Sequence, residues 1–386
     1  MWSKLLCALP FVLFLVPYPG ESSEINVAAK PNEDIASELL NAWKEGCAAT
    51  TASTIVIPKG TYPMTQVELV GPCKAPIELQ ILGTLKAPSD PKTFDSSKDW
   101  LTLKNVDSFT LSAGIFDGQG TATWEQEDCK NTGSCDKLPN NLSFNFVTNS
   151  LIKNIFSLDS KLFHVSVLGG KNITFDHVAI KAPGTSHNTV GIYISKVPDV
   201  TIQNSLIGTG DDCVAIMDGT ENLVIKGLVC GPGRGITVGS LGNTPDEEPV
   251  KGVHVEDCKL IGTENGLRIK TLPNSQPGKV TDIHYNNIEM EDVKNPIIIN
   301  QEHCPNKKNC SIEKPSQVKI SKVSYNHILG ASASKVAVTL KCSSAVPCED
   351  VEVGDINLTF NGAPAESICS NIKPVLSGKQ VPSLCS

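Results

Sequence analysis

Short alternating segments recur between about residues 100 and 360 of the chain. In each copy apolar residues stand two apart, so one face of an extended strand is buried and the other is solvated. Copies return every 22 to 30 residues and begin at Ile173, Val200, Leu223, Val253 and Val351. Gly, Asn and Asp separate the copies, and a helical period is absent. The pattern predicts parallel strands that stack turn upon turn.

A right-handed parallel β-helix fits this pattern best, because each coil hides its apolar face only against its neighbours. A β-sandwich or a propeller is the alternative, and short alternating strands alone exclude neither. Near the N-terminus, Asn32-Glu-Asp precedes a segment from Ile35 to Trp43 with apolar residues at helical spacing. We expect a helix there that caps the open end of the coil. The chain is therefore interpreted as all-β, with a single domain over residues 24–386.

The first residues resemble a targeting segment. Lys4 precedes an apolar run from Leu5 to Val16, and small or turn-forming residues follow from Pro17 to Ser23. This order is typical of a cleavable signal peptide, here residues 1–23. The run is shorter than the roughly 20 apolar residues that a bilayer span needs, and no other segment approaches that length. The mature protein is expected to be soluble, secreted and extracellular.

The 14 cysteines suggest disulfide bonds. Cys7 lies in the predicted signal, and the remainder face an oxidising compartment. Separations along the chain suggest the pairs Cys47/Cys73, Cys129/Cys135, Cys213/Cys230, Cys304/Cys310, Cys342/Cys348 and Cys369/Cys385. Cys258 is left over. Zinc is the alternative, but the chain has no CxxC and its seven histidines lack ligand spacing, so no metal or other cofactor is expected.

The sequons indicate the cellular compartment, and the net charge limits the classes of partner. Four sequons fit a secretory route, at Asn141, Asn172, Asn309 and Asn357. The net charge of -8 argues against nucleic acid or an anionic membrane as a partner. An acidic ligand would need a local basic pocket.

The densest candidate chemistry is a pair of adjacent carboxylates, Asp211 and Asp212, beside two glycines and Cys213. Neighbours in a regular strand point to opposite faces, so both acids reach one cleft only if the chain bends there. The glycines permit that bend, and a bridge from Cys213 to Cys230 would fix it. An ordinary surface turn is the alternative.

Arg268 and Lys270 stand two apart, so they share one face of a strand while Ile269 points inward. Two cations opposite paired carboxylates favour a site for an anionic ligand. A solvated strand face is the alternative interpretation.

These motifs resemble those of plant polygalacturonases, and among them the pollen-type exopolygalacturonases, over nearly the whole mature chain. The matching stretches are PheAspGlyGlnGly at Phe116, AspSerLysLeuPheHis ending at His164, GlyAspAspCys at Gly210, CysGlyProGly at Cys230, GlySerLeuGly at Gly239 and AsnGlyLeuArgIleLys at Asn265. The resemblance implies a right-handed parallel β-helix and inverting hydrolysis of α-1,4-linked galacturonate without a cofactor. It also implies location in the cell wall, and we expect a monomer.

The resemblance also assigns roles. Asp211 corresponds to the general acid and Asp212 to a base that activates water. Arg268 and Lys270 correspond to the cations that hold a substrate carboxylate. Three further positions are expected to face the substrate: Asn188, Arg234 and His303.

Several family positions are altered. The family's Asn-Thr-Asp-Gly reads Asn188-Thr-Val190-Gly here, and valine cannot take a proton. Its Gly-His-Gly reads Gly-Arg234-Gly, and a permanent cation favours an ionised Asp211 over the protonated form that an acid needs. Its Asp-Gln-x-Tyr-Cys ends in His303-Cys, which reduces the stacking area against a sugar.

The altered positions are catalytic positions of the family, whereas the motifs of the scaffold match the family pattern. Losing one of two bases costs about 10² to 10⁴ in rate. We therefore expect a pectin-binding protein with weak or lost hydrolysis. An active exopolygalacturonase and a purely structural or protein-interaction role are the alternatives, and all three share one fold.

Overall fold

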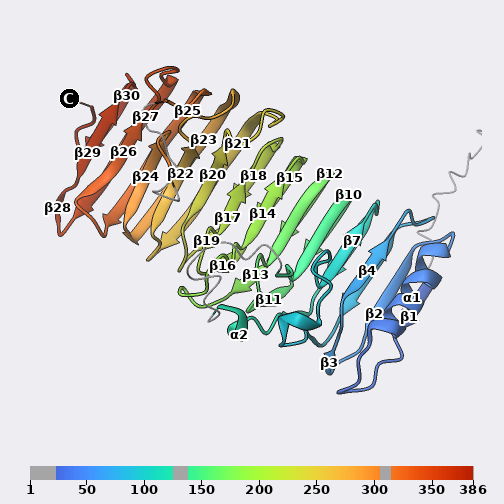
Figure 1. The fold of residues 1–386 in the computed structure, drawn as a ribbon. Helices are drawn as coiled ribbons and strands as arrows, with labels where there is room; N and C mark the ends of the chain where they lie inside the picture. The colour runs from blue at the N-terminus through green and yellow to red at the C-terminus, as the bar shows by residue number, and fades with distance from the viewer. Residues whose placement is uncertain (1–22, 125–137, 305–313, 386) are drawn as a thin grey trace, which may run out of the picture.

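The computed structural model describes residues 23–124, 138–304 and 314–385. Their strands wind into coils that follow one another along a single axis from the N-terminal to the C-terminal end (Figure 1). All the strand pairings are parallel except the one between β27 and β28 in the described part of the chain. Three stacks of paired strands, called A, B and C below, form the walls.

Stack A runs from one end of the coil to the other, and the long strands β10, β12 and β21 each contribute part of their length to it. Its members are β1 (Ser23–Asn26), β2 (Ser53–Ile57), β5 (Ile77–Ile81), β8 (Phe109–Ser112), β10 (Leu142–Lys153), β12 (Val165–Asp176), β15 (Pro198–Gln203), β18 (Glu221–Lys226), β21 (Val250–Ile261), β23 (Gly278–Val293), β25 (Val318–Ser332), β27 (Glu349–Phe360) and β30 (Val375–Val381).

Stack B carries the candidate site, and the first halves of β10 and β12 belong to it. Its other members are β4 (Val67–Val70), β7 (Leu101–Lys104), β14 (Ile192–Ser195), β17 (Val214–Ile216), β20 (Ile236–Leu241), β22 (Asn265–Thr271), β24 (Asn295–Asn300), β26 (Val336–Lys341) and β29 (Glu366–Ser370).

Stack C is the shortest. Its members are β3 (Thr61–Pro63), β6 (Thr84–Lys86), β9 (Ile115–Asp117), β11 (Phe156–Leu158), β13 (Ala179–Lys181), β16 (Leu206–Gly208) and β19 (Val229–Cys230), which pairs with the second half of β21. The remaining elements are β28 (Ala363–Pro364), the 3₁₀-helix η1 (Pro91–Thr93) and the helices α1 (Ala36–Ala48) and α2 (Thr121–Trp124).

The predicted repeats are successive strands of stack A. Ile173, Val200, Leu223 and Val253 stand in register on β12, β15, β18 and β21. Each is at most 1% exposed, because the apolar face of every coil packs on the coils beside it. The repeat also extends beyond the predicted range, since β1 and β30 already belong to the same stack. The parallel β-helix is thus confirmed.

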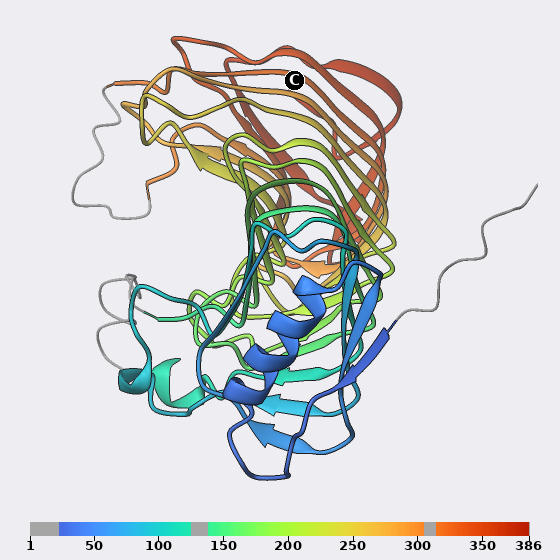
Figure 2. The same cartoon turned by 90° about the vertical axis from the view of Figure 1, so that its right-hand side faces the viewer.

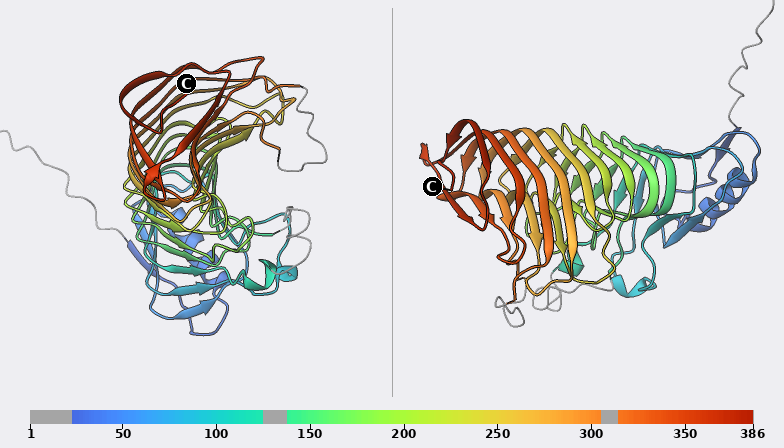
Figure 3. Two further views of the ribbon diagram at one scale, coloured as in Figure 1. Left: turned by 90° about the vertical axis from the view of Figure 1, so that its left-hand side faces the viewer. Right: turned by 90° about the horizontal axis from the view of Figure 1, so that it is seen from above.

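The predicted N-terminal helix is confirmed as α1. Leu39 and Trp43 on its inner face are 0% and 3% exposed, and the Trp43 Nε1 donates a hydrogen bond to the Val70 carbonyl at 3.1 Å. The end-on view shows α1 lying across the first coils (Figure 2), and two further views show it at the opposite end from β30 (Figure 3). The helix covers apolar side chains that an open coil would expose. None of the described helices is long and apolar enough to cross a bilayer.

Four of the six expected disulfides lie wholly within the described residues, and they are Cys47–Cys73, Cys213–Cys230, Cys342–Cys348 and Cys369–Cys385. Cys258 is a buried free thiol, as expected. Cys129, Cys135, Cys310 and most of the predicted signal peptide lie outside the described residues. Four disulfides fit an oxidising, extracellular environment.

The sequons differ in accessibility. The side chain of Asn141 is buried at 2% exposure and its amide donates to the Ser157 hydroxyl at 3.0 Å, which argues against the candidate glycan there. A folded chain has no room for a glycan there. Asn172 is exposed and Asn357 is half-buried, so both stay predictions, and Asn309 lies outside the described residues.

Candidate active site

The paired acids lie in the turn between β16 and β17, where the chain enters stack B. Gly210 is required just before them, because a β-carbon at that position would stand 1.7 Å from the Ser186 carbonyl oxygen. The Gly210 N–H donates to the Thr189 hydroxyl at 3.0 Å. The Cys213–Cys230 disulfide ties the turn to the next coil. The predicted bend therefore exists and is braced on both sides.

Asp212 is held from three directions. Its Oδ1 accepts from the Arg268 Nη2 at 2.9 Å and from the Thr237 hydroxyl at 2.7 Å. The Lys270 Nζ stands 3.8 Å from its Oδ2. Since Asp212 is 3% exposed, its negative charge is compensated by these groups rather than by water.

Arg268 and Lys270 are brought together on β22 as the sequence predicts, and Ile269 between them is 0% exposed. Burial lowers the pKa of Lys270, and the neighbouring Asp212 opposes that shift. The Arg268 Nε also donates to the Thr237 hydroxyl at 3.2 Å, which fixes its orientation. This end of the site is a rigid cluster of cations around one carboxylate.

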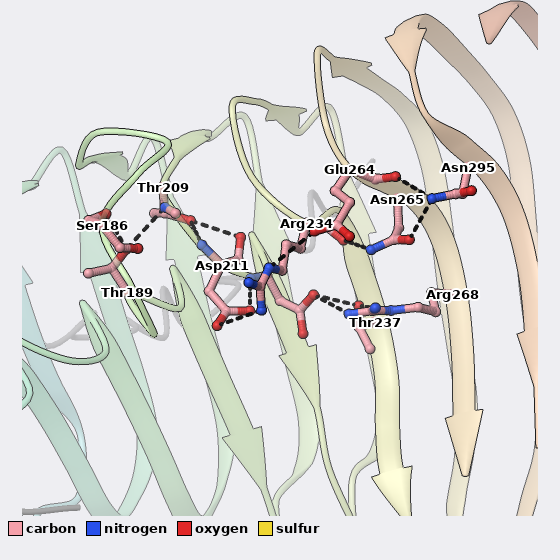
Figure 4. A network of polar contacts seen from close by, with 12 residues as sticks. Ser186, Thr189, Thr209, Asp211, Arg234, Thr237, Glu264, Asn265, Arg268 and Asn295 are labelled. Atoms are coloured by element: carbon pink, nitrogen blue, oxygen red, sulfur yellow. Dashed lines mark hydrogen bonds and ion pairs between the residues drawn. The ribbon is translucent and has the colours of Figure 1, made fainter. Parts of the chain in front are cut away.

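Asp211 has a different environment from its neighbour. Burial raises the pKa of Asp211 above its ordinary value, the charge of Asp212 raises it further, and Arg234 and Lys270 only partly oppose them. The Arg234 Nη1 is 3.5 Å from the Asp211 Oδ2 (Figure 4). Arg234 lowers the pKa of Asp211, as expected, but burial and Asp212 outweigh the arginine, so the net direction is upward.

Val190 occupies the coil before Asp212. Ile192 pairs with Val214, so Val190 and Asp212 take equivalent positions in successive coils, and the Gly191 N–H donates to the Asp212 carbonyl at 2.9 Å. The Val190 side chain is 6% exposed. An apolar, buried side chain thus stands one coil before Asp212, in the equivalent position.

His303 lies among the charges of the site, and Asn188 stands two residues before Val190. Burial, together with the charges of Lys270 and Arg268, lowers the pKa of His303 to about 4, so the imidazole is neutral at moderately acidic pH. Asn188 lies in the loop before β14 with a left-handed φ of 56°, and its substrate role stays a prediction.

Two residues of the site were not predicted from the sequence. Thr237 joins Asp212 to Arg268, and it pairs in register with Arg268 on β22. Glu264 holds the other side of Arg234, with its Oε2 3.3 Å from the Nε (Figure 4). Aligning the coils at the period of the repeat would have placed Thr237 beside Arg268, but no signal in the sequence marks Glu264.

The arrangement gives two neighbouring carboxyl groups different surroundings, since burial raises the pKa of Asp211 while Asp212 lies among cations. Carboxyl groups in different environments are the kind of pair from which glycoside hydrolases take their acid and base. On a parallel β-helix, such a pair is typical of carbohydrate-active proteins.

Comparison with known proteins identifies the family within that class. The chain belongs to glycosyl hydrolases family 28, whose family model matches residues 47–381. It is 52% identical to a polygalacturonase of Nicotiana tabacum, over 97% of this chain and 96% of the relative. It is 47% identical to an exopolygalacturonase of Oenothera organensis, over 92% of this chain and 98% of the relative.

Solved structures share the fold. An endo-xylogalacturonan hydrolase from Aspergillus tubingensis superposes with a TM-score of 0.80 at 20% identity, over 93% of this chain and all of the other. A hyperthermoactive exopolygalacturonase from Thermotoga maritima gives a TM-score of 0.75 at 16% identity, over 92% of each chain. At such identities the likeness concerns the coil and not the substrate.

Proposed function

We propose that this chain is a secreted protein of the cell wall that binds galacturonan, the acidic chain of pectin, with weak or no hydrolysis. Binding is supported by the cations of the cleft. Arg268, Lys270 and Arg234 gather around two carboxylates in a chain whose net charge is -8. A polyuronate needs such a local basic site on an acidic protein. Relatives named polygalacturonase, at up to 52% identity, support the same ligand class.

The apolar residue at position 190 is the main support for the proposed loss of hydrolysis. Inverting hydrolysis requires carboxylates that remove a proton from the attacking water. Val190 offers none, and Asp212, in the equivalent position one coil on, accepts hydrogen bonds from Thr237 and Arg268. With Asp212 as the single base, held by these hydrogen bonds, the rate of hydrolysis should be lower by a factor on the order of 10² to 10⁴.

The acid side of the reaction is kept. The raised pKa of Asp211 lets its carboxyl group hold the proton that a leaving oxygen needs. The deficit of the site is therefore confined to water activation. A retained acid also favours the second candidate, an active exopolygalacturonase.

A paired binding and hydrolysis assay tests the proposal. We expect calorimetry to show binding of tri-galacturonate by the purified protein. A reducing-end assay on polygalacturonic acid between pH 4 and 7 should give a rate at least roughly 100-fold below the Nicotiana tabacum relative assayed in parallel. Equal rates would establish the active enzyme instead. Absence of binding, with Arg268→Ala and Lys270→Ala indistinguishable from the unchanged protein, would leave only a structural role.

A further inference from the structure

The outer face of stack C is apolar. One residue on each of five successive strands points outward, because the residue that follows it is at most 3% exposed and faces the core. These five residues stand in register from β9 to β19 (Figure 1) and are called the apolar column: Ile115, Phe156, Ala179, Leu206 and Val229. Leu206 is 57% exposed and Ile115 is 37% exposed.

The outer face of stack A has the opposite character. One of its solvent-facing columns consists of Asp176, Gln203, Lys226 and Glu256 on successive strands. Polar outer side chains are typical of strands with one solvated face. The coil itself therefore does not require an apolar outer column on stack C, and exposed apolar patches mark binding surfaces.

The apolar column forms most of a groove. All its members except Ile115 line this groove, whose volume is about 790 Å³, and Pro183 and Pro232 add to its apolar wall. In the part of the chain that the structure describes, the charged residues of its lining are one acid and one base, Asp159 and Lys181. The paired acids and the cations of the cleft do not line it. The groove is thus a separate surface, with the size and composition of a binding site.

The strands of the column limit how a partner can bind. Each of them pairs with a strand on both sides, so its backbone groups are already hydrogen-bonded and only side chains remain for a partner. Adjacent strands lie roughly 4.8 Å apart, so the column is roughly 19 Å long. A helix of about 13 residues has that length, and its turns repeat every ~5.4 Å. The apolar stripe of an amphipathic helix therefore matches the column.

The charge at one end of the column indicates the charge of that helix. Beyond Val229 the register continues with Lys259 and then Glu289. The Lys259 Nζ lies 3.0 Å from Glu289 and 2.9 Å from Glu291, so two carboxylates share one cation. The whole chain has a net charge of -8, so a second copy would be repelled and a basic segment attracted.

We infer that the apolar column is the docking surface for a basic amphipathic helix of another protein. The helix lays its apolar stripe along Phe156, Leu206 and Val229 and places lysines or arginines beside Glu289 and Glu291. The inference concerns a protein partner on the outer wall of stack C, so it does not depend on the proposed binding of galacturonan in the cleft.

Fluorescence anisotropy with a labelled peptide of about 14 residues tests the inference. The peptide has leucine at every third or fourth position and lysine on its other face, and a second peptide has the same composition without a stripe. We expect the first peptide to bind and the second to bind at least roughly tenfold more weakly. Leu206→Ser should weaken binding of the first peptide about tenfold, because a large apolar contact is lost.

Leu376→Ser is the matched control, because Leu376 is 43% exposed on β30 of stack A. It should leave the affinity for the peptide unchanged. The double variant Glu289→Gln/Glu291→Gln should weaken binding several-fold at low salt. Glu221→Gln/Glu349→Gln removes the same charge from two ion pairs of stack A and should have no such effect.

Two results would overturn the inference. One is equal binding of the two peptides, or equal affinity of Leu206→Ser and the unchanged protein for the first. The other is sedimentation of the unchanged protein as a dimer that Leu206→Ser converts to a monomer, because the column would then bind a second copy. Should Leu206→Ser not fold, the double variant at Glu289 and Glu291, which are 62% and 59% exposed, still gives the deciding comparison. Either result leaves the proposed function standing, because Leu206 lies outside the cleft.

Discussion

At the residue scale, two adjacent aspartates of the same sequence motif acquire opposite properties. Asp211 is buried beside another carboxylate, which raises its pKa. Asp212 is compensated by Arg268 and Thr237 at hydrogen-bonding distance. Because their environments differ, two identical residues of one motif can take different parts in proton transfer.

Asp211 should reduce stability at neutral pH. The folded protein holds its proton more tightly than the unfolded chain, so the free energy of unfolding falls as the pH rises from the ordinary value of 3.8 through the raised pKa. Asp211→Asn removes this penalty and should raise the free energy of unfolding by an amount on the order of 1 kcal/mol at pH 7. The difference should disappear below about pH 3.8, which thermal unfolding at several pH values measures.

Asp107→Asn is the control with the opposite sign. Hydrogen bonds from Thr148, Ser108 and Asn149 lower the pKa of Asp107, so its charge stabilises the folded state above the ordinary pKa. This variant should be less stable at neutral pH and approach the unchanged protein in acid. A loss of stability in Asp211→Asn at pH 7 would contradict the burial argument.

Most of the cleft residues could be predicted from the sequence, but their environments could not. Asp211, Asp212, Arg268 and Lys270 lie together as the motifs indicate. The direction of the Asp211 shift depends on depth of burial, which a motif does not encode. For the same reason the sequence alone could not show that the sequon at Asn141 is buried.

At the scale of elements, the two-residue period determines much of the fold. Strands such as β15 and β18 have clear alternation, and they were predicted correctly. β3 and β6 have three residues each, which is too short for a period to be recognised. They form because neighbouring coils supply their hydrogen-bond partners. The sequence of the segment itself does not show those partners.

The Cys213–Cys230 disulfide should be needed for binding as well as for stability. It is buried and adjoins Asp212, so it holds the turn that carries the acids. Replacing both cysteines by alanine should cost about 3 kcal/mol of unfolding free energy, from a sequence separation of 17 residues, and weaken tri-galacturonate binding.

The pair Cys342–Cys348, outside the acid-bearing turn, serves as the control for that double replacement. Its removal should lower the melting temperature without a change in ligand affinity. Calorimetry and thermal unfolding of the two double variants separate the effects. Equal losses of affinity in both variants would mean that the first disulfide has no particular part in the site.

At the scale of the whole molecule, the accessibility of the coil surface decides where a glycan fits. Asn172 is exposed on β12, whereas the Asn141 amide is enclosed by Ser157 and its neighbours. Protein secreted from a eukaryotic host should carry a glycan at Asn172 and none at Asn141. Mass spectrometry of peptides after enzymatic deglycosylation checks this, and occupancy at Asn141 would contradict the burial of that side chain.

Restoring a carboxylate at position 190 shows whether the missing base limits hydrolysis. Reducing-end release from polygalacturonic acid would be measured for the unchanged protein, Val190→Asp, and the double variant Val190→Asp/Arg234→His, with Asp211→Asn added to the double variant as the control. We expect little release by the unchanged protein and an increase of roughly 10² or more in the restored variants, abolished by Asp211→Asn. Vigorous release by the unchanged protein, with no increase in the restored variants, would show that Asp212 alone activates water and that Val190 does not limit hydrolysis.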